Sequence, residues 1–234
     1  MVDTSRFTKE ISKIITAASF TMCALCFTFS LTAFAEDAEG ISFDGLKPVE
    51  DASVAMAYID PEADFSAFSR VMILEPYVAF RSNWQRDQNR SRSRNIRARD
   101  MERIKADVAS LFKEVLTERL EADDGYEVVD VADYDVLLLR PAIIDLDITA
   151  PDTMSAGRSR TFTTSTGAAT LYIELFDSVS GAIIGRAADR QATRGAGGTL
   201  SWSSRVMNTA EGRRMFGRWA DQLRSFLDQH YTEK

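Results

Sequence analysis

The residues with the most evident chemistry are the arginines between positions 81 and 103. Eight arginines stand there against three acids, a local charge of +5 in a chain whose net charge is −7. Guanidinium groups bind carboxylates and phosphates through paired hydrogen bonds, and a tryptophan ring in the same segment can stack on such a cation. The candidate binding residues are Arg81, Trp84, Arg86, Arg90, Arg92, Arg94, Arg97 and Arg99. Arg158 and Arg160, in a later polar segment, are expected to join them.

This arginine-rich segment has two interpretations. The favoured one is a solvated loop whose charge is balanced by the protein's own acids. The second is a docking site for anionic lipid headgroups, a cell-wall polymer or an acidic protein surface, because arginines at the start of a helix oppose its dipole and call for a compensating anion. The acidity of the whole chain argues against nucleic acid as the partner.

Other residues offer little catalytic chemistry. His230 is the single histidine, lies four residues from the end of the sequence, and has no accompanying G-x-S-x-G motif, so a Ser-His-Asp hydrolase is not expected. A structural role for His230 near a helix end is the better interpretation. The Gly195–Gly198 turn lacks the residues of a phosphate-binding loop and is expected to be a flexible connection.

Carboxylates could in principle hold a cation or hydrolyse a polymer. Asp130, Asp133 and Asp135 cluster between two strands, but their spacing does not match a calcium loop, so we expect a solvated turn and no metal or cofactor. A second set could supply the paired acids of a glycosidase. It comprises Asp145, Asp147 and Glu174. Any acidic sheet offers such pairs. A carboxylate-dependent hydrolase that acts on an envelope polymer is therefore kept as the alternative, and the protein is predicted not to be an enzyme.

The first 35 residues have the pattern of a secretory signal peptide. Basic residues precede 22 uncharged positions, Ile14–Ala35, which end in the small-residue site Ala33-Phe34-Ala35. Cleavage after Ala35 would leave a periplasmic or secreted protein, and the rival is an uncleaved membrane anchor. Both cysteines, Cys23 and Cys26, fall inside this segment, so the mature chain would lack disulfides and thiol chemistry. Neither follows a small residue, which weakens a lipoprotein interpretation.

Two long amphipathic helices and a set of strands must position these side chains. Apolar residues recur every three or four positions in Ile96–Leu120 and again from about Ser203 to Tyr231, which predicts a helix in each range. Gly125 is expected to end the first helix. Strands are predicted at Ser69–Tyr77 and Tyr126–Val131. Val136–Arg140 and Ile143–Ile148 are expected to form one long strand or two short ones, with Pro141 as a bulge or edge mark.

The strand pattern is clearest in Gly167–Thr193. Ala169, Leu171, Ile173 and Leu175 alternate with more polar positions, and the Asp177–Gly181 turn leads into a second apolar run. This period of two predicts an antiparallel hairpin at the middle of a sheet.

The expected fold is therefore α+β. We expect a mainly antiparallel sheet of four to five strands, covered by two amphipathic helices, in the order β-α-β-β-β-β-α. The domain boundaries are a signal peptide at 1–35, a flexible N-terminal arm at 36–64 and a single α+β domain at 65–234. Val78–Asp100 and Thr149–Thr166 are expected to be loops.

The order of several short motifs resembles a known family. They are Phe43-Asp44-Gly45-Leu46, Asp60-Pro61 with Phe65-Ser66-Ala67-Phe68, Leu137-Leu138-Leu139-Arg140 with Ala142–Asp145, and Asp177-Ser178 with Ser180-Gly181 and Asp189. In this order they resemble the domain of unknown function 3313 (DUF3313) family of bacterial secreted proteins and lipoproteins, over about residues 41–228. The resemblance implies an envelope location and no established activity. It supplies no catalytic residue.

These observations predict an exported, non-enzymatic envelope protein. It would act as a binding or scaffold module that docks an anionic envelope component or an envelope protein. Association with a membrane would be peripheral, or would depend on an uncleaved N-terminal segment.

Overall fold

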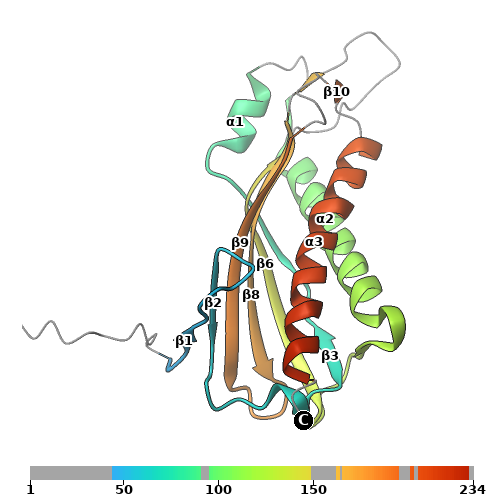
Figure 1. Ribbon diagram of the computed structural model, residues 1–234. Coiled ribbons are helices and arrows are strands. Elements are labelled where there is room, and N and C mark those ends of the chain that lie inside the picture. The colour runs from blue at the N-terminus through green and yellow to red at the C-terminus, as the bar shows by residue number, and fades with distance from the viewer. Residues whose placement is uncertain are drawn as a thin grey trace, which may run out of the picture. The chain divides into compact units, whose positions relative to one another are not determined.

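The computed structural model describes residues 44–90, 95–148, 162–163, 165–194, 201–202 and 205–231. In this part of the chain one large sheet carries two long helices on one face (Figure 1). The strands of the sheet are β1 (Lys47–Pro48), β2 (Met56–Ile59), β3 (Arg70–Ile73), β4 (Tyr77–Phe80), β5 (Glu127–Val128), β6 (Val136–Ile148), β8 (Ser165–Asp177) and β9 (Ile183–Arg194). The helices are α1 (Trp84–Asn89), α2 (Ala98–Glu121) and α3 (Arg205–Tyr231), and β7 (Phe162–Thr163) pairs with β10 (Ser201–Trp202).

The α+β class is confirmed, but the predicted strand number, direction and order are wrong. The sheet has eight strands among the described residues, in the order β1-β2-β9-β8-β6-β3-β5, and β4 also pairs with β6. It is mixed, because β3 and β4 both run parallel to β6 and β5 runs parallel to β3. The expected antiparallel character is confined to the β1-β2-β9-β8-β6 part.

The central hairpin is confirmed. β8 and β9 occupy the middle of the sheet, and Gly181 in their turn has a φ of +70°, a value that a glycine adopts without strain. The predicted inward-facing residues of β8 are all buried, with exposed fractions of 1 to 7%. They are Ala169, Leu171, Ile173 and Leu175.

The segment with Pro141 forms one continuous strand, β6. Leu139 accepts a hydrogen bond from the Leu74 amide of the β3 side, and Pro141, two residues on, must face the same neighbour. There β3 has ended at Ile73 and β4 has not yet begun at Tyr77. The missing amide hydrogen of Pro141 therefore lies where no strand requires it, which explains a proline inside the sheet.

A bulge near the end of β6 reverses which residues face the core. Asp145 has a φ of 50°, and the pairing with β8 shifts between Ile144 and Asp147. Ile143 before the bulge and Leu146 after it are both buried, although an odd number of positions separates them. Asp145 itself is exposed.

Part of the segment that was expected to be a flexible arm, 36–64, forms strands of the sheet. β2 pairs with β9 over four residues, from Met56 with Ala188 to Ile59 with Gly185, and β1 pairs with β2. Residues 44–64 therefore extend the sheet instead of preceding it. The segment that includes β4 and α1 was likewise expected to be a loop, and α2 begins at Ala98, two residues later than predicted.

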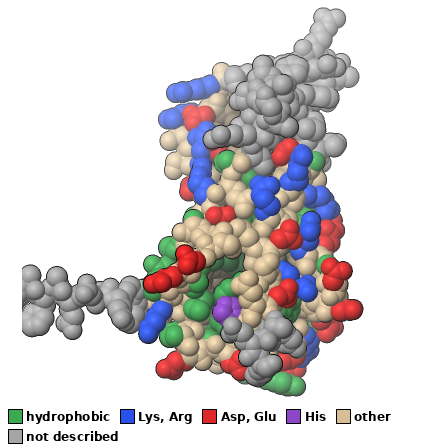
Figure 2. Space-filling model, in the orientation of Figure 1, with side chains coloured by type: hydrophobic (Ala, Val, Ile, Leu, Met, Phe, Trp, Pro, Cys, Tyr) green, Lys and Arg blue, Asp and Glu red, His purple; other side chains and the backbone are tan. Residues whose placement is uncertain are grey.

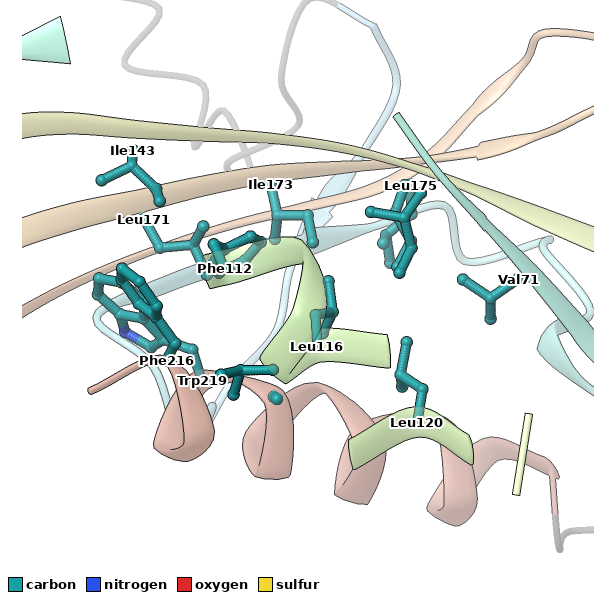
Figure 3. Close-up of a cluster of buried hydrophobic side chains, with 14 of the residues drawn as sticks. Val71, Phe112, Leu116, Leu120, Ile143, Leu171, Ile173, Leu175, Phe216 and Trp219 are labelled. Atoms are coloured by element: carbon teal, nitrogen blue, oxygen red, sulfur yellow. The ribbon is translucent and has the colours of Figure 1, made fainter. Parts of the chain in front are cut away.

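The main core lies between the helices and the inner face of the sheet. Figure 3 shows Phe112 and Leu116 of α2 and Phe216 and Trp219 of α3 pointing toward Leu171 and Ile173 of β8. The rings of Phe112 and Phe216 meet edge to face, with centroids 5.3 Å apart. Both predicted helical stripes are thus confirmed as core-facing.

The end of α2 is held by a side chain of α3. Arg224 donates to the carbonyls of Leu120 (2.8 Å) and Ala122 (3.0 Å), which also accept from the backbone amides of Tyr126 and Gly125. A cation at this place also suits the negative end of the helix dipole. A Cβ on Gly125 would lie 1.9 Å from the Arg224 guanidinium. α2 itself ends at Glu121, and the 3-10 turn Ala122–Asp124 separates it from Gly125, which was predicted to end it. Gly125 leaves room for this arginine.

Candidate functional site

An apolar cleft opens between α3 and the β8-β9-β2 part of the sheet. Its volume is about 510 Å³, within the range of ordinary small-molecule sites. Figure 2 shows this hollow with hydrophobic side chains at its base and the histidine at its edge. Most of the apolar side chains that line it come from three strands and two helices. They are Ala57, Ile59, Leu171, Ile173, Leu175, Ala187, Phe112, Leu116, Trp219, Leu223 and Phe226.

The cleft exists because the inner face of β9 lacks bulk. Strand pairing places Leu175 opposite Gly185, Ile173 opposite Ala187, and Leu171 opposite Asp189, so each large residue of β8 has a small or polar neighbour. The next strand continues the pattern with Ala57 beside Ala187. Helix α3 packs on the large residues of β8, which hold it away from the small residues of β9 and β2. A space therefore remains between the helix and the β9-β2 edge.

The segment Val49–Val54 lies along the mouth of the cleft and is tied to its walls. The side-chain amide of Gln222 on α3 donates to the Ser53 carbonyl at 2.8 Å. At the strand end of the segment, Ala55 donates to the Asp189 carboxylate at 3.3 Å. These bonds join the helix wall and the strand wall through one short connection.

Asp189 forms the polar end of the cleft. It accepts hydrogen bonds from the indole of Trp219 (2.8 Å) and from the amide of Gln191 (3.1 Å). Arg218 in turn donates to Gln191 at 2.6 Å. A carboxylate on the helix-facing side of a central strand is thus satisfied by α3, and it fixes the position of Trp219.

The rim of the cleft is polar, and its charged groups are mainly acidic. The polar rim side chains are Glu50, Asp51, Asp221, Ser225, Gln229 and His230. The His230 ring lies 4.5 Å from the Phe226 ring and 5.5 Å from the Phe65 ring, measured between centroids. The only histidine of the chain therefore packs among aromatic rings at the cleft, a place that its position near the end of the sequence did not reveal.

The cleft is not evident from the sequence. The one sequence feature that indicates the cleft is a group of small residues, Gly185, Ala187 and Ala188. They come after a strand of large apolar residues. That signal becomes informative only when the strand register is known.

The predicted arginine site is divided by the structure. Trp84 is 1% exposed, stacks on Phe80 with centroids 4.0 Å apart, and donates its indole hydrogen to the Ile148 carbonyl at 2.8 Å. The expectation that Trp84 offers its ring to a partner is therefore corrected, because its ring faces lie in a small core with Ile96. Arg81 pairs with Asp87 (2.8 Å) and Asp147 (2.9 Å) within the chain.

The other described arginines of the set lie at the surface. Arg86, Arg90, Arg97 and Arg99 are exposed, and Arg86 approaches Asp87 at 3.4 Å. Figure 2 shows Lys and Arg side chains along the edge where Figure 1 places α1. Arg92, Arg94, Arg158 and Arg160 lie outside the described residues, as does the Gly195–Gly198 turn. Their predicted roles stay predictions.

The predicted carboxylate clusters are mostly engaged in ion pairs. Arg70 binds Asp135 and also Asp133 at 2.9 Å, while Asp130 is exposed. No group of three or more potential ligands arranged to hold a metal ion is found among the residues that the structure describes.

In the second set, Glu174 accepts from Arg140 at 2.6 Å and from Tyr172 at 3.0 Å, and Asp147 pairs with Arg81. Carboxylates paired in this way are poorly placed to act as the acid and base of a hydrolase.

The described residues also bear on membrane insertion. Within them, no helix combines the length and the apolar character that crossing a bilayer requires.

Fold and site together define a class of protein: an α+β domain in which two helices cover one face of a mixed sheet and leave a cleft at one edge. The chain belongs to the family described as "Protein of unknown function (DUF3313)", whose model matches residues 32–223. A comparison with curated proteins finds no match.

Several solved structures are similar to this chain at low identity. The XCC0632 protein from Xanthomonas campestris is 11% identical, with a TM-score of 0.40, over 71% of this chain and 89% of its own. PelC from Paraburkholderia phytofirmans, a dodecamer, is 10% identical, with a TM-score of 0.35, over 68% and 89%. The hypothetical protein CT253 from Chlamydia trachomatis is 10% identical, with a TM-score of 0.37, over 69% and 99%.

The Arg70–Asp135 contact predicts a specific dependence of stability on pH. Hydrogen bonds from Arg70 and Ser69 lower the Asp135 pKa from 3.8 to about 2. A carboxylate with a depressed folded-state pKa stabilises the fold above its unfolded pKa, and this contribution is lost as the pH falls through the folded pKa. The free energy of unfolding of Asp135→Asn, measured with urea, should lie below that of the wild type at pH 6, and the gap should narrow between about pH 4 and pH 2.

The matched control is Asp130→Asn, which removes an exposed carboxylate of the same segment and should change the free energy of unfolding little. A gap between wild type and Asp135→Asn that stays constant down to pH 2 would contradict the assignment.

Proposed function

We propose that this protein is a non-enzymatic binding module whose ligand site is the cleft between α3 and the β8-β9-β2 part of the sheet. The observation that carries the proposal is a cavity of about 510 Å³ with an apolar floor and a polar rim. Sites for small molecules have this composition, with a few polar groups that orient the ligand. The occupant is a single small apolar or amphiphilic molecule, because the cavity has the volume of a small-molecule site.

The cleft is built from parts that a purely structural core would not need. A fold that only required stability would fill the inner face of β9 with larger side chains, because an unfilled apolar cavity reduces stability. Instead, Gly185 and Ala187 leave the space open, and Gln222 and Asp189 hold Val49–Val54 across its mouth. This combination supports binding as the role of the cleft.

Filling the cleft should abolish binding of an apolar probe. The substitution Ala187→Leu adds a branched side chain to the floor, and the affinity for the neutral dye N-phenyl-1-naphthylamine, measured by its fluorescence, should fall about tenfold or more because the ligand must overlap the new methyl groups. The matched control is Ala192→Leu on the same strand, an exposed position outside the cleft lining. Equal dye affinity in both variants would refute the cleft as the binding site.

A second candidate function is docking of the arginine-bearing surface on an anionic envelope component. The observation in its favour is that Arg90, Arg97 and Arg99 are exposed and form no ion pair with any carboxylate that the structure describes. Guanidinium groups in this state bind phosphate and carboxylate groups readily.

Vesicle binding tests this surface. The full chain should bind phosphatidylcholine vesicles that contain phosphatidylglycerol, but not pure phosphatidylcholine, and the binding should weaken at high salt because exposed charges are screened. Replacing Arg90, Arg92 and Arg94 by Ser should reduce the vesicle-bound fraction in a sedimentation assay. Replacing Arg119 and Arg213, which pair with acids of the neighbouring helix, is the control and should not reduce it. Unchanged binding of the triple variant would exclude this function.

The module is proposed to work in the cell envelope. The support is the basic start, the uncharged stretch and the Ala33-Phe34-Ala35 site of the first 35 residues. Mass spectrometry of the protein purified from its native cells should find Glu36 as the first residue. Cleavage would change the net charge from −7 to −8, because residues 1–35 hold three basic and two acidic side chains. An intact mass would instead favour a retained anchor.

A further inference from the structure

The charge around the cleft is unbalanced. Among the described residues that line it, four are acidic and one is an arginine. The acids are Glu50, Asp51, Asp189 and Asp221. The arginine, Arg186, pairs with Asp44 and is therefore already neutralised within the protein. Arg119 pairs with Asp221 at 3.2 Å, but both side chains are about half exposed, so solvent weakens this pair.

Glu50 and Asp51 place two negative charges at the mouth of the cleft. Both are exposed, and no basic side chain that the structure describes pairs with either. A hollow with low-dielectric walls and charges of one sign at its opening concentrates counter-ions there. In Figure 2 acidic side chains stand beside the opening of the hollow. The mouth therefore attracts cations and repels anions.

We infer that the cleft binds a small amphiphile with one alkyl chain and a protonated primary amine. The alkyl chain lies on the apolar floor formed by Ile173, Ala187 and Leu223. The ammonium group lies at the mouth, near Glu50 and Asp51. This inference rests on the proposed function of the cleft and adds to it the charge of the ligand.

Three probes of equal chain length separate the inference from the proposed function. Decylamine, decanol and decanoate are titrated into the full chain below their micelle concentrations at pH 7, with displacement of N-phenyl-1-naphthylamine as the readout. Decylamine should bind about tenfold more tightly than decanoate at low salt, and the ratio should fall at high salt because the mouth charges are exposed.

Two variants locate the selectivity. Glu50→Gln with Asp51→Asn should bring the amine-to-carboxylate ratio close to one and leave decanol binding unchanged. Its control, Glu127→Gln with Asp130→Asn, removes two exposed acids at the opposite edge of the sheet and should keep the ratio.

The outcomes are distinct. If the dye and decanol bind in the cleft but decylamine and decanoate bind alike, the inference fails and the proposed function stands. If no probe binds and the dye does not respond to Ala187→Leu, both fail. Binding of an apolar peptide without any binding of decylamine, or self-association that excludes decylamine, would also overturn the inference.

Discussion

The structure depends on one contact, between the buried row of β8 and the paired helices α2 and α3. Leu171 and Ile173 meet Phe112 and Leu116 from one helix and Trp219 from the other. Because these side chains are large and fully enclosed, they fix how far each helix stands from the sheet. The other features of the inner face follow from that spacing. Where β9 and β2 carry small residues, the helices stay at the same distance from the sheet. The space that is left between them is the cleft.

The polar groups near the cleft follow from the same constraint. An open space between a helix and a sheet exposes polar groups that a close-packed core would exclude. Asp189 and Gln222 each bind elements from two sides of this space and so hold the walls together without filling it. The site is thus maintained by hydrogen bonds at its ends and by dispersion contacts along its floor.

How far the sequence predicts this structure depends on the range of the interactions. The period-two pattern of β8 and the helical stripes of α2 and α3 are local, and their predictions were confirmed. By contrast, β2 is four residues long and owes its existence to pairing with β9, about 130 positions away, so the sequence showed only an acidic arm. Asp147, an ion-pair partner of Arg81, could not be predicted either. It becomes a neighbour of Arg81 only because β4 pairs with β6. The cleft could not be predicted from the sequence because it forms where side chains are small, and small residues have no periodic pattern.

The proline inside β6 has a consequence for how the sheet can change. At Pro141 the strand offers no hydrogen to a neighbour, so the strands on that side, β3 and β4, are held to β6 independently, one before this position and one after it. The link between them, from Leu74 to Pro76, is not locked into the ladder beyond the single bond of Leu74. Lengthening that link would leave the register on either side intact. This side of β6 therefore contains a natural point for insertions, at Leu74 and Glu75, which are both exposed.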